Sequence, residues 1–310
     1  MPYTVKHHYH STLFVPSLDE ASRFFARVFG RESKVLGEYL IGGRARGAQF
    51  NYPSDYATFT PIAEVQLECV DPTLLVIDGV QSHESVSEPQ LGSLAWFVDG
   101  IEDLWRALRQ RGLRGTDMSD RIYDGDDPPL DVSSTPIIFT LPAETGLSYE
   151  FTVFMPHRDP RGDPPVHATV PADPLGIECC SHHTVLTDQK PRALSLLVDV
   201  LGGRVIDEGR NGLLGTDSTY VALADGIIEV GIPVDEGSPA MEDWHRHAPD
   251  DAYHALTWKV RDLDEAARHL EAVGVSVQAR TATALVTDPA ETLGVAWGFT
   301  ADLLANDPRR

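Results

Sequence analysis

The feature of this 310-residue sequence that most constrains its fold is internal repetition. Residues 18–30 read LDEASRFFARVFG, and residues 263–274 near the other end read LDEAARHLEAVG. Both segments have apolar residues three or four positions apart, acidic residues in the first turn and a final glycine, a pattern typical of a short amphipathic helix. Residues 101–113 and 191–202 fit the same description. The sequence therefore predicts four related helices.

A short stretch rich in β-branched and apolar residues precedes each of these helices. The four stretches are residues 11–15, 94–98, 184–187 and 255–260. Further apolar stretches follow each helix, as at residues 218–223 and 226–233, and Gly, Pro, Asp or Asn separates them. Each repeat therefore predicts a β-α-β-β-β module. Four modules predict an α+β fold with two domains of two modules each.

A second repetition divides the chain into halves. The tetrapeptide PAET occurs at residues 142–145 and again at 289–292, each time before a final strand. Between the halves lies a proline-rich stretch, whose prolines remove backbone donors and discourage both helix and central strand. We therefore predict an N-terminal domain, a linker and a C-terminal domain at residues 1–158, 159–174 and 175–305. The modules are expected at about residues 5–80, 91–155, 178–235 and 252–303.

The composition narrows the partners and the compartment. A net charge of −22 repels phosphate backbones and anionic membrane surfaces, so we expect neither nucleic acid nor a membrane as a partner. There is no charged and apolar leader and no run of about 18 apolar residues. The cysteines, Cys69, Cys179 and Cys180, suit buried thiols better than a disulfide framework. We expect a cytoplasmic protein that binds a small molecule, with a homodimer left open.

His and Glu residues recur near the ends of the predicted strands. His10 directly precedes the segment STLFVPSLD, Glu68 lies in LECVDP, and Glu150 lies in GLSYEF. In these segments the chain resembles the vicinal-oxygen-chelate superfamily, which includes glyoxalase I, methylmalonyl-CoA epimerase, bleomycin-resistance proteins and extradiol dioxygenases. The resemblance covers nearly the whole chain. It implies paired modules that curl a sheet around a divalent metal, with ligands from the first and last strand of each module.

The resemblance assigns candidate ligands to each module. The first module offers His10 and Glu68. The second offers Glu150, whereas Ser93 stands where a histidine is expected. The third offers Glu229 and, of two adjacent histidines, His182, which the spacing to Asp188 favours over His183. The fourth offers His254, one residue out of the commonest register, and has Gly298 where the family has Glu.

The sequence leaves open which modules face one another. If the first faces the fourth, the two sets are His10, Glu68 and His254, and His182, Glu229 and Glu150. If neighbours face one another, the sets are His10, Glu68 and Glu150, and His182, Glu229 and His254. We favour His10, Glu68 and His254 as the metal ligands, because the superfamily's hydroquinone-type dioxygenases draw ligands from the first and last modules.

Two histidines and one carboxylate leave positions on a divalent metal open for substrate and oxygen. The resemblance thus implies a metal-dependent enzyme acting on vicinal oxygens. Our first choice is an extradiol or hydroquinone-type ring-cleaving dioxygenase with Fe(II); Mn, Zn and Ni are alternative metals. A glyoxalase-like lyase, isomerase or epimerase is the second choice, and a metal-free bleomycin-resistance-like binding protein is the third. No catalytic residue is assigned, although residues 243–247 (DWHRH), interpreted as a solvated loop, could supply an acid or base.

Overall fold

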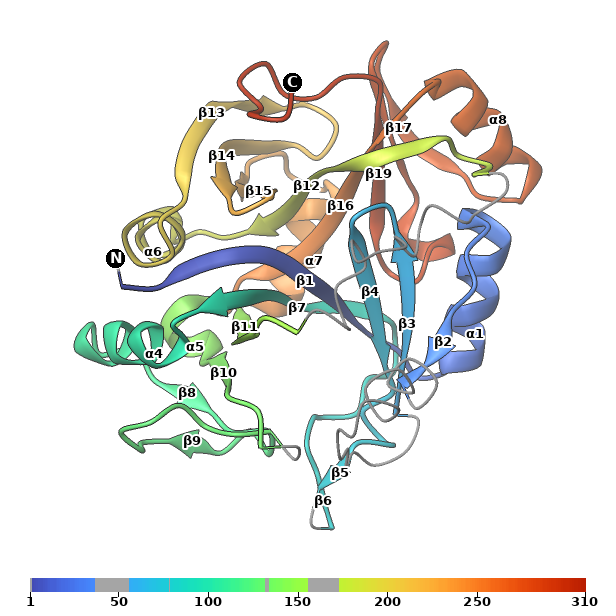
Figure 1. The fold of residues 1–310 in the computed structure, drawn as a ribbon. Helices are drawn as coiled ribbons and strands as arrows, with labels where there is room; N and C mark the ends of the chain where they lie inside the picture. Colours follow the sequence, from blue (N-terminus) through green and yellow to red (C-terminus); the bar gives the residue numbers. More distant parts are fainter. Residues whose placement is uncertain (1, 37–55, 78, 132–133, 156–172) are drawn as a thin grey trace.

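The protein is built on two main β-sheets with a few helices packed against them (Figure 1). The computed structural model describes residues 2–36, 56–77, 79–131, 134–155 and 173–310. Strands between residues 4 and 153 form a nine-stranded sheet, and strands between residues 177 and 300 form an eight-stranded sheet. The predicted fold class, a mixed fold of repeated strand and helix units, is confirmed. Most of the predicted linker, residues 159–172, lies outside the described residues.

The first repeats build the N-terminal sheet. Its strands are β1 (Thr4–Phe14), β2 (Lys34–Val35), β3 (Ala57–Ile62), β4 (Val65–Val70), β7 (Gln90–Asp99), β8 (Gly115–Thr116), β9 (Ile122–Tyr123), β10 (Ile137–Thr140) and β11 (Ser148–Val153). The strand order is β2-β3-β4-β1-β7-β11-β10-β8-β9. The first strands β1 and β7 pair antiparallel at the centre, and each is flanked by the parallel last strand of its own repeat, β4 or β11. A separate hairpin pairs β5 (Val76–Ile77) with β6 (Val80–Gln81).

The second half repeats this plan. Its strands are β12 (Ile177–Leu186), β13 (Arg204–Asn211), β14 (Thr216–Leu223), β15 (Gly226–Pro233), β16 (Ala252–Val260), β17 (Val277–Arg280), β18 (Ala284–Thr287) and β19 (Ala296–Thr300). The order is β13-β14-β15-β12-β16-β19-β18-β17. Here β12 and β16 pair antiparallel at the centre, flanked by the parallel strands β15 and β19. In both sheets neighbouring repeats therefore share one sheet.

All four predicted helices are present. They are α1 (Leu18–Phe24) with the π-helix η1 (Phe25–Phe29), α4 (Ile101–Gln110), α6 (Lys190–Leu194) with the π-helix η4 (Ser195–Val200), and α8 (Leu263–Ala272). Ser17 and Asp262 cap the two most similar helices, because their side chains accept bonds from first-turn backbone N–H groups. Gly30 ends the first of them with a φ of 63°, which favours glycine.

The loop interpretation of residues 243–247 is wrong. These residues end the helix α7 (Pro239–His247), which begins with Ser238 accepting a bond from the backbone N–H of Met241 and with Pro239 in its first turn. Asp243 is buried, and its carboxylate contacts a histidine ring of β16. The Ser-Pro pair at residues 238 and 239, a typical helix start, could therefore have predicted this helix from the sequence.

One continuous apolar core joins the two halves. Phe24, Phe25 and Phe29 of the first repeat surround Trp297 of the last, with ring centroids 5.1–6.4 Å apart. In Figure 1 the helix α1 lies beside the strands and helix of the last repeat. The first and fourth repeats therefore pack against each other through buried aromatic side chains, although they do not share a sheet.

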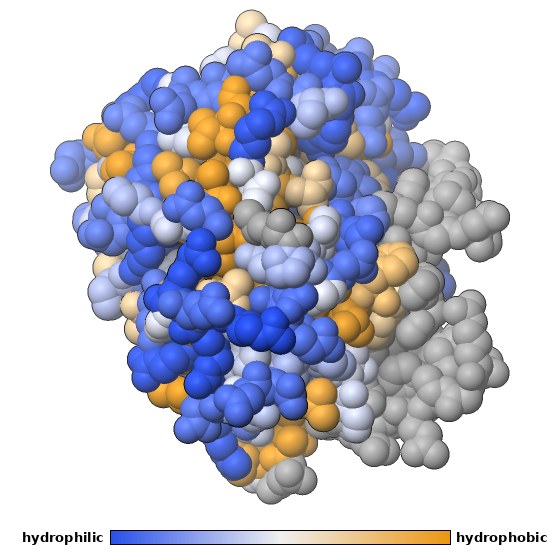
Figure 2. Space-filling model, turned by 60° about the vertical axis from the view of Figure 1, so that its left-hand side comes forward, coloured by the Kyte–Doolittle hydropathy of each residue, from blue (hydrophilic) through white to orange (hydrophobic). Residues whose placement is uncertain are grey.

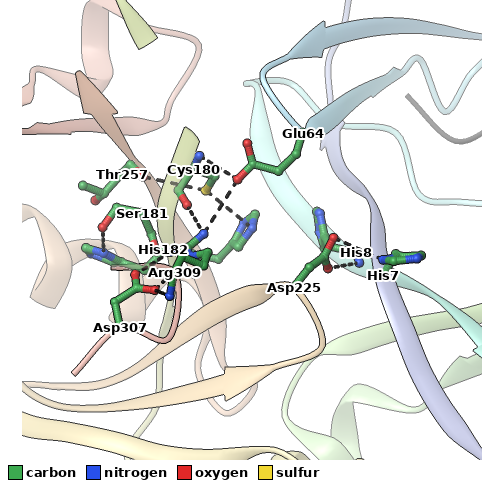
Figure 3. A network of polar contacts seen from close by, with 11 residues as sticks. His7, His8, Glu64, Cys180, Ser181, His182, Asp225, Thr257, Asp307 and Arg309 are labelled. Atoms are coloured by element: carbon green, nitrogen blue, oxygen red, sulfur yellow. Dashed lines mark hydrogen bonds and ion pairs between the residues drawn. The ribbon is translucent and has the colours of Figure 1, made fainter. Parts of the chain in front are cut away.

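Polar contacts also cross between the halves (Figure 3). The backbone N–H of Cys180 donates to Glu64 of the first half at 2.9 Å. Arg309, near the C-terminus, donates to the backbone carbonyls of Cys180 and Ser181 at 2.7 and 2.8 Å, and two bonds to Asp307 hold its guanidinium. The planar fork thus binds a bulged stretch of β12 that has lost regular ladder bonds.

The outer surface and the cysteines agree with the composition. Figure 2 shows a face that is hydrophilic over most of its area, with apolar residues in separate groups. Cys69 and Cys180 are buried, Cys179 is half-buried, and all three are free thiols, as the sequence predicts. Within the described residues, no helix is long and apolar enough to cross a membrane.

Replacing Arg309 by lysine is expected to destabilise the fold by about 1–3 kcal/mol. The ammonium group cannot donate to both carbonyls in one plane, so at least one buried acceptor loses its partner. Urea unfolding at pH 7 measures the difference, and Arg310→Lys, at the neighbouring position, is the matched control. Equal midpoints for both variants would show that the fork contributes nothing.

Candidate functional site

The register of the N-terminal sheet places the candidate ligands side by side. His10 on β1 is paired with Ala95 on β7, and Glu150 on β11 is paired with the same Ala95. Glu68 on β4 is paired with Thr12, two residues beyond His10 and on the same face of β1. His10 Nδ1 lies 3.4 Å from a Glu68 carboxylate oxygen, and His10 Nε2 lies 3.4 Å from one of Glu150.

A short hydroxyl chain supports Glu68. Ser93 donates from its hydroxyl to Thr12 Oγ1 at 3.0 Å, and Thr12 donates to Glu68 Oε2 at 3.2 Å. Ser93 pairs with Thr12 across the centre of the sheet, so it occupies the position that mirrors His10 in the second repeat. The residue that replaces the expected histidine therefore acts on Glu68 through Thr12.

These side chains line a cavity of about 440 Å³ on the N-terminal sheet. Aromatic rings make up much of the wall, namely Tyr9, Phe14, Tyr56, Phe59 and Phe139. The C-terminal half supplies one edge, with His247, Asp250, Asp251 and Tyr253. The cavity is large enough for a small molecule, and both halves of the chain contribute to it.

Burial dominates the electrostatics of this cavity floor. It raises the pKa of the Glu68 carboxyl above its usual value; His10 opposes this, the negative charge of Glu150 adds to it, and the hydrogen bond from Thr12 also opposes it. Two carboxylates this close together favour a cation between or beside them. In the structure the imidazole of His10 lies in contact with both carboxylates.

The donor chemistry of this site fits a divalent metal. One imidazole and two carboxylates are ligands that Zn²⁺ and Mn²⁺ accept. Within the described residues, however, no three His, Cys, Asp or Glu side chains already converge as a metal site. At this cavity the reason is visible, because His10 directs one ring nitrogen to Glu68 and the other to Glu150. Three-fold coordination requires one side chain to rotate toward the others.

The C-terminal sheet brings His182 and Glu229 together, with 3.3 Å between His182 Nε2 and a Glu229 oxygen. Glu229 is fully buried and accepts hydrogen bonds from Thr184 at 2.7 Å, Ser218 at 2.5 Å and Asn211 at 3.0 Å. Burial alone would raise its pKa, but the contact with His182 and the hydroxyl donors outweigh burial and lower the pKa to about 2.

The fourth repeat supplies no ligand to the second pair. Ala255 stands opposite Thr184, where Ser93 stands opposite Thr12 in the first half. Gly298 stands beside Thr257, and a Cβ added there would lie 2.4 Å from the Thr257 hydroxyl. A side chain at position 298 would therefore displace Thr257. A cavity of about 260 Å³ covers this part of the sheet.

His254, which we grouped with His10 and Glu68 from the sequence, is not among the residues that line their cavity. His254 lies at a break in the register between β12 and β16, one residue before Ala255, and its Nδ1 contacts the Asp243 carboxylate of α7 at 2.7 Å. The bulge at this break directs the side chain toward α7. The set that the structure brings together is the one expected for neighbouring modules, His10, Glu68 and Glu150; Glu150 is not beside His182 and Glu229.

Several residues of the cavity were missed by sequence reasoning. Thr12 follows His10 at the spacing of one strand face, which was a legible signal. His83 and Asp120 lie in connecting segments without a motif, and Asp251 and Tyr253 reach the cavity from the other half. Only the three-dimensional packing of the halves assigns these to the site.

Comparisons with known proteins bear on the fold. No model of a protein family matches the sequence, and no curated protein sequence matches it. Solved structures do match, and among them are three that cover almost the whole chain. A 4-hydroxymandelate synthase mutant from Streptomyces coelicolor has a TM-score of 0.59 at 12% identity, covering 98% of this chain and 95% of that one.

Two further structures match over a similar share of the chain. The Mn(II)-bound glyoxalase from Novosphingobium aromaticivorans has a TM-score of 0.57 at 11% identity, covering 99% of this chain and 86% of that one. A halotolerant catechol dioxygenase has a TM-score of 0.55 at 12% identity, covering 96% and 87%. At such identities the similarity establishes the fold alone. The chain thus shares its overall fold with these three structures.

Acid is expected to destabilise the protein through His183. This ring contacts Tyr253 at 2.7 Å in the buried seam between the halves, and burial, with smaller effects of His182 and Arg309, lowers its pKa to about 3. In the unfolded state His183 takes up a proton near pH 6.5, whereas in the folded state it does so only near pH 3. The free energy of unfolding therefore falls as the pH drops from 6.5 to 3. Between pH 7 and pH 5 the loss from this group is about 2 kcal/mol.

The measurement is urea unfolding of wild type and His183→Gln at pH 7 and pH 5. The difference in stability between the two proteins should shrink by that amount at the lower pH, because only wild type carries the suppressed imidazole. A difference that does not change with pH would show that His183 titrates normally.

Proposed function

We propose that the N-terminal half is a divalent-metal-dependent enzyme that acts on a small molecule carrying two neighbouring oxygens. The observation that carries the proposal is His10 lying between Glu68 and Glu150 at the floor of the 440 Å³ cavity. His10, Glu68 and Glu150 would hold the metal. When bound, the metal would act as a Lewis acid on the two substrate oxygens.

The ligand set favours proton transfer over oxygen chemistry. Fe(II) oxygenases typically use two histidines and one carboxylate, whereas the proposed ligand set, His10, Glu68 and Glu150, has one imidazole and two carboxylates. His254, which would have been the second histidine, binds Asp243 instead. We therefore place a lyase, isomerase or epimerase ahead of the ring-cleaving dioxygenase that we favoured from the sequence.

The remaining residues of the cavity suit the proposed substrate. Aromatic walls bury the apolar body of a small molecule, and the hydroxyl groups of Thr12 and Ser93 keep Glu68 oriented toward the floor. The C-terminal half supplies one edge of the cavity, so a bound molecule would contact both halves of the chain.

Metal content tests the proposal. We expect about one divalent ion per chain in protein purified without a tag, measured by elemental analysis. His10→Ala should remove most of it, because the only imidazole of the set is lost, whereas Ser93→Ala should retain it, because Ser93 acts only through Thr12. His182→Ala, at the equivalent position of the other half, is the matched control and should also retain it.

Equal metal content in wild type and His10→Ala would overturn the assignment of the site. Wild type that neither contains metal nor takes up Zn²⁺ or Mn²⁺ on loading, yet binds an aromatic ligand stoichiometrically, would support a metal-free binding protein instead. The N-terminal cavity would then be a binding site alone.

Oxygen consumption separates the two reaction classes. We expect wild type incubated with Fe(II) to consume no more oxygen than His10→Ala incubated with the same Fe(II), when both are given catechol or hydroquinone, because the proposed ligand set has only one imidazole. An oxygen electrode measures this directly. Stoichiometric uptake with formation of a ring-cleaved product would restore the dioxygenase.

A further inference from the structure

The proposed function leaves one polar pair of the cavity without a role. His83 follows the β5–β6 hairpin of the first repeat, and Asp120 lies in the turn between β8 and β9 of the second. Both residues line the N-terminal cavity, and His83 Nδ1 lies 3.0 Å from Asp120 Oδ2. Two connecting segments from different repeats therefore meet through this pair at the cavity wall.

The position of the His83 ring is fixed by packing. It stands against the ring of Phe14 with centroids 5.3 Å apart and an interplanar angle of 62°. Phe14 in turn lies against Gly92, where a Cβ would come within 2.2 Å of the ring. Only glycine at position 92 leaves room for Phe14, so Gly92, Phe14 and Asp120 together hold the imidazole in place.

The contact with Asp120 also sets the chemistry of the imidazole. A carboxylate that accepts from Nδ1–H fixes the tautomer, which leaves Nε2 as the proton acceptor of the neutral ring. The same arrangement orients a histidine base in hydrolases. His83 remains about a quarter exposed, with 27% of its side chain accessible, so the ring can meet a molecule in the cavity.

His83 acts electrostatically on the floor of the same cavity. It is among the groups whose charge lowers the pKa of Glu68, which links the ring to the floor where His10 lies. Two titratable groups therefore interact with His83, namely Asp120 in direct contact and Glu68 in the same cavity. A molecule bound at the floor would lie between the proposed metal ligands and this imidazole.

We propose that His83, held by Asp120, is the proton-transfer base of the N-terminal cavity. This inference rests on the proposed function and adds a catalytic residue to it. His83 Nε2 takes a proton from the substrate carbon next to a carbonyl. The C–H bond breaks, an N–H bond forms, and the electron pair remains on the substrate as an enediolate. The imidazolium then returns the proton to carbon, so nothing is oxidised or reduced.

Solvent exchange of a carbon-bound proton tests this step. The probe is 2-hydroxyacetophenone, which carries neighbouring oxygens and an aromatic ring, incubated in D₂O with Zn²⁺-loaded protein. Proton NMR follows the loss of its CH₂ signal, and elemental analysis gives the zinc content of every sample. We expect wild type to exchange the signal faster than the protein-free solution.

The variants separate catalysis from structure. His83→Gln keeps a donor toward Asp120 but has no base, and should slow exchange by at least about 100-fold with zinc content unchanged. Asp120→Asn should slow it by about tenfold with zinc content unchanged, because the imidazolium formed in the step loses the anionic acceptor of its Nδ1–H. His269→Gln is the matched control and should exchange at the wild-type rate, because His269 bonds the carbonyl of Val28 outside the cavity.

Exchange by His83→Gln at the wild-type rate would overturn the assignment of the base, and so would zinc-loaded wild type that exchanges no faster than solvent. In both cases zinc that is retained by wild type and lost by His10→Ala leaves the proposed metal site standing. Zinc content that does not respond to His10→Ala would instead mark failure of the proposed function itself.

Discussion

The antiparallel pairing of β1 with β7 is the constraint on which the candidate site depends. It sets His10 opposite Ala95 and Thr12 opposite Ser93. Because each first strand also pairs with the last strand of its own repeat, Glu68 and Glu150 are brought to the two sides of His10. A slip of one residue in this pairing would turn His10 to the other face of the sheet. The strand register therefore decides whether these three side chains meet at all.

The C-terminal half has the same frame and a different set of side chains. His182 and Glu229 repeat the positions of His10 and Glu68, but Glu229 accepts hydrogen bonds from five other side chains. Because these hydrogen bonds already stabilise the charge of Glu229, a metal ion would add less stabilisation there. This half instead supplies one edge of the N-terminal cavity, through the end of α7 and the residues that follow it. The two halves thus share a plan and differ in what they contribute.

Features set by neighbouring residues could be predicted from the sequence, whereas features set by contacts between distant residues could not. The four helices depend on local patterns and caps such as Ser17, and they were predicted closely. His10, Glu68 and Glu150 stand in strand motifs, so each could be found singly. Their grouping depends on which repeats share a sheet, and no local pattern records that. His254 could not be placed either, because a bulge decides where its side chain points.

The strand β1 also explains why the cavity floor should be stiff. His10 and Thr12 face the cavity, whereas Ser11 between them faces the other half, where its hydroxyl lies 2.7 Å from that of Tyr253. Tyr253 contacts His183 at the same distance, so polar groups are satisfied on both faces of one strand. Moving β1 would leave buried donors and acceptors without partners on the interface side, at a cost of about 1–3 kcal/mol for each. The seam between the halves therefore restrains the strand that carries His10, and a site with little freedom to move is one that can hold its ligands in place before a substrate arrives.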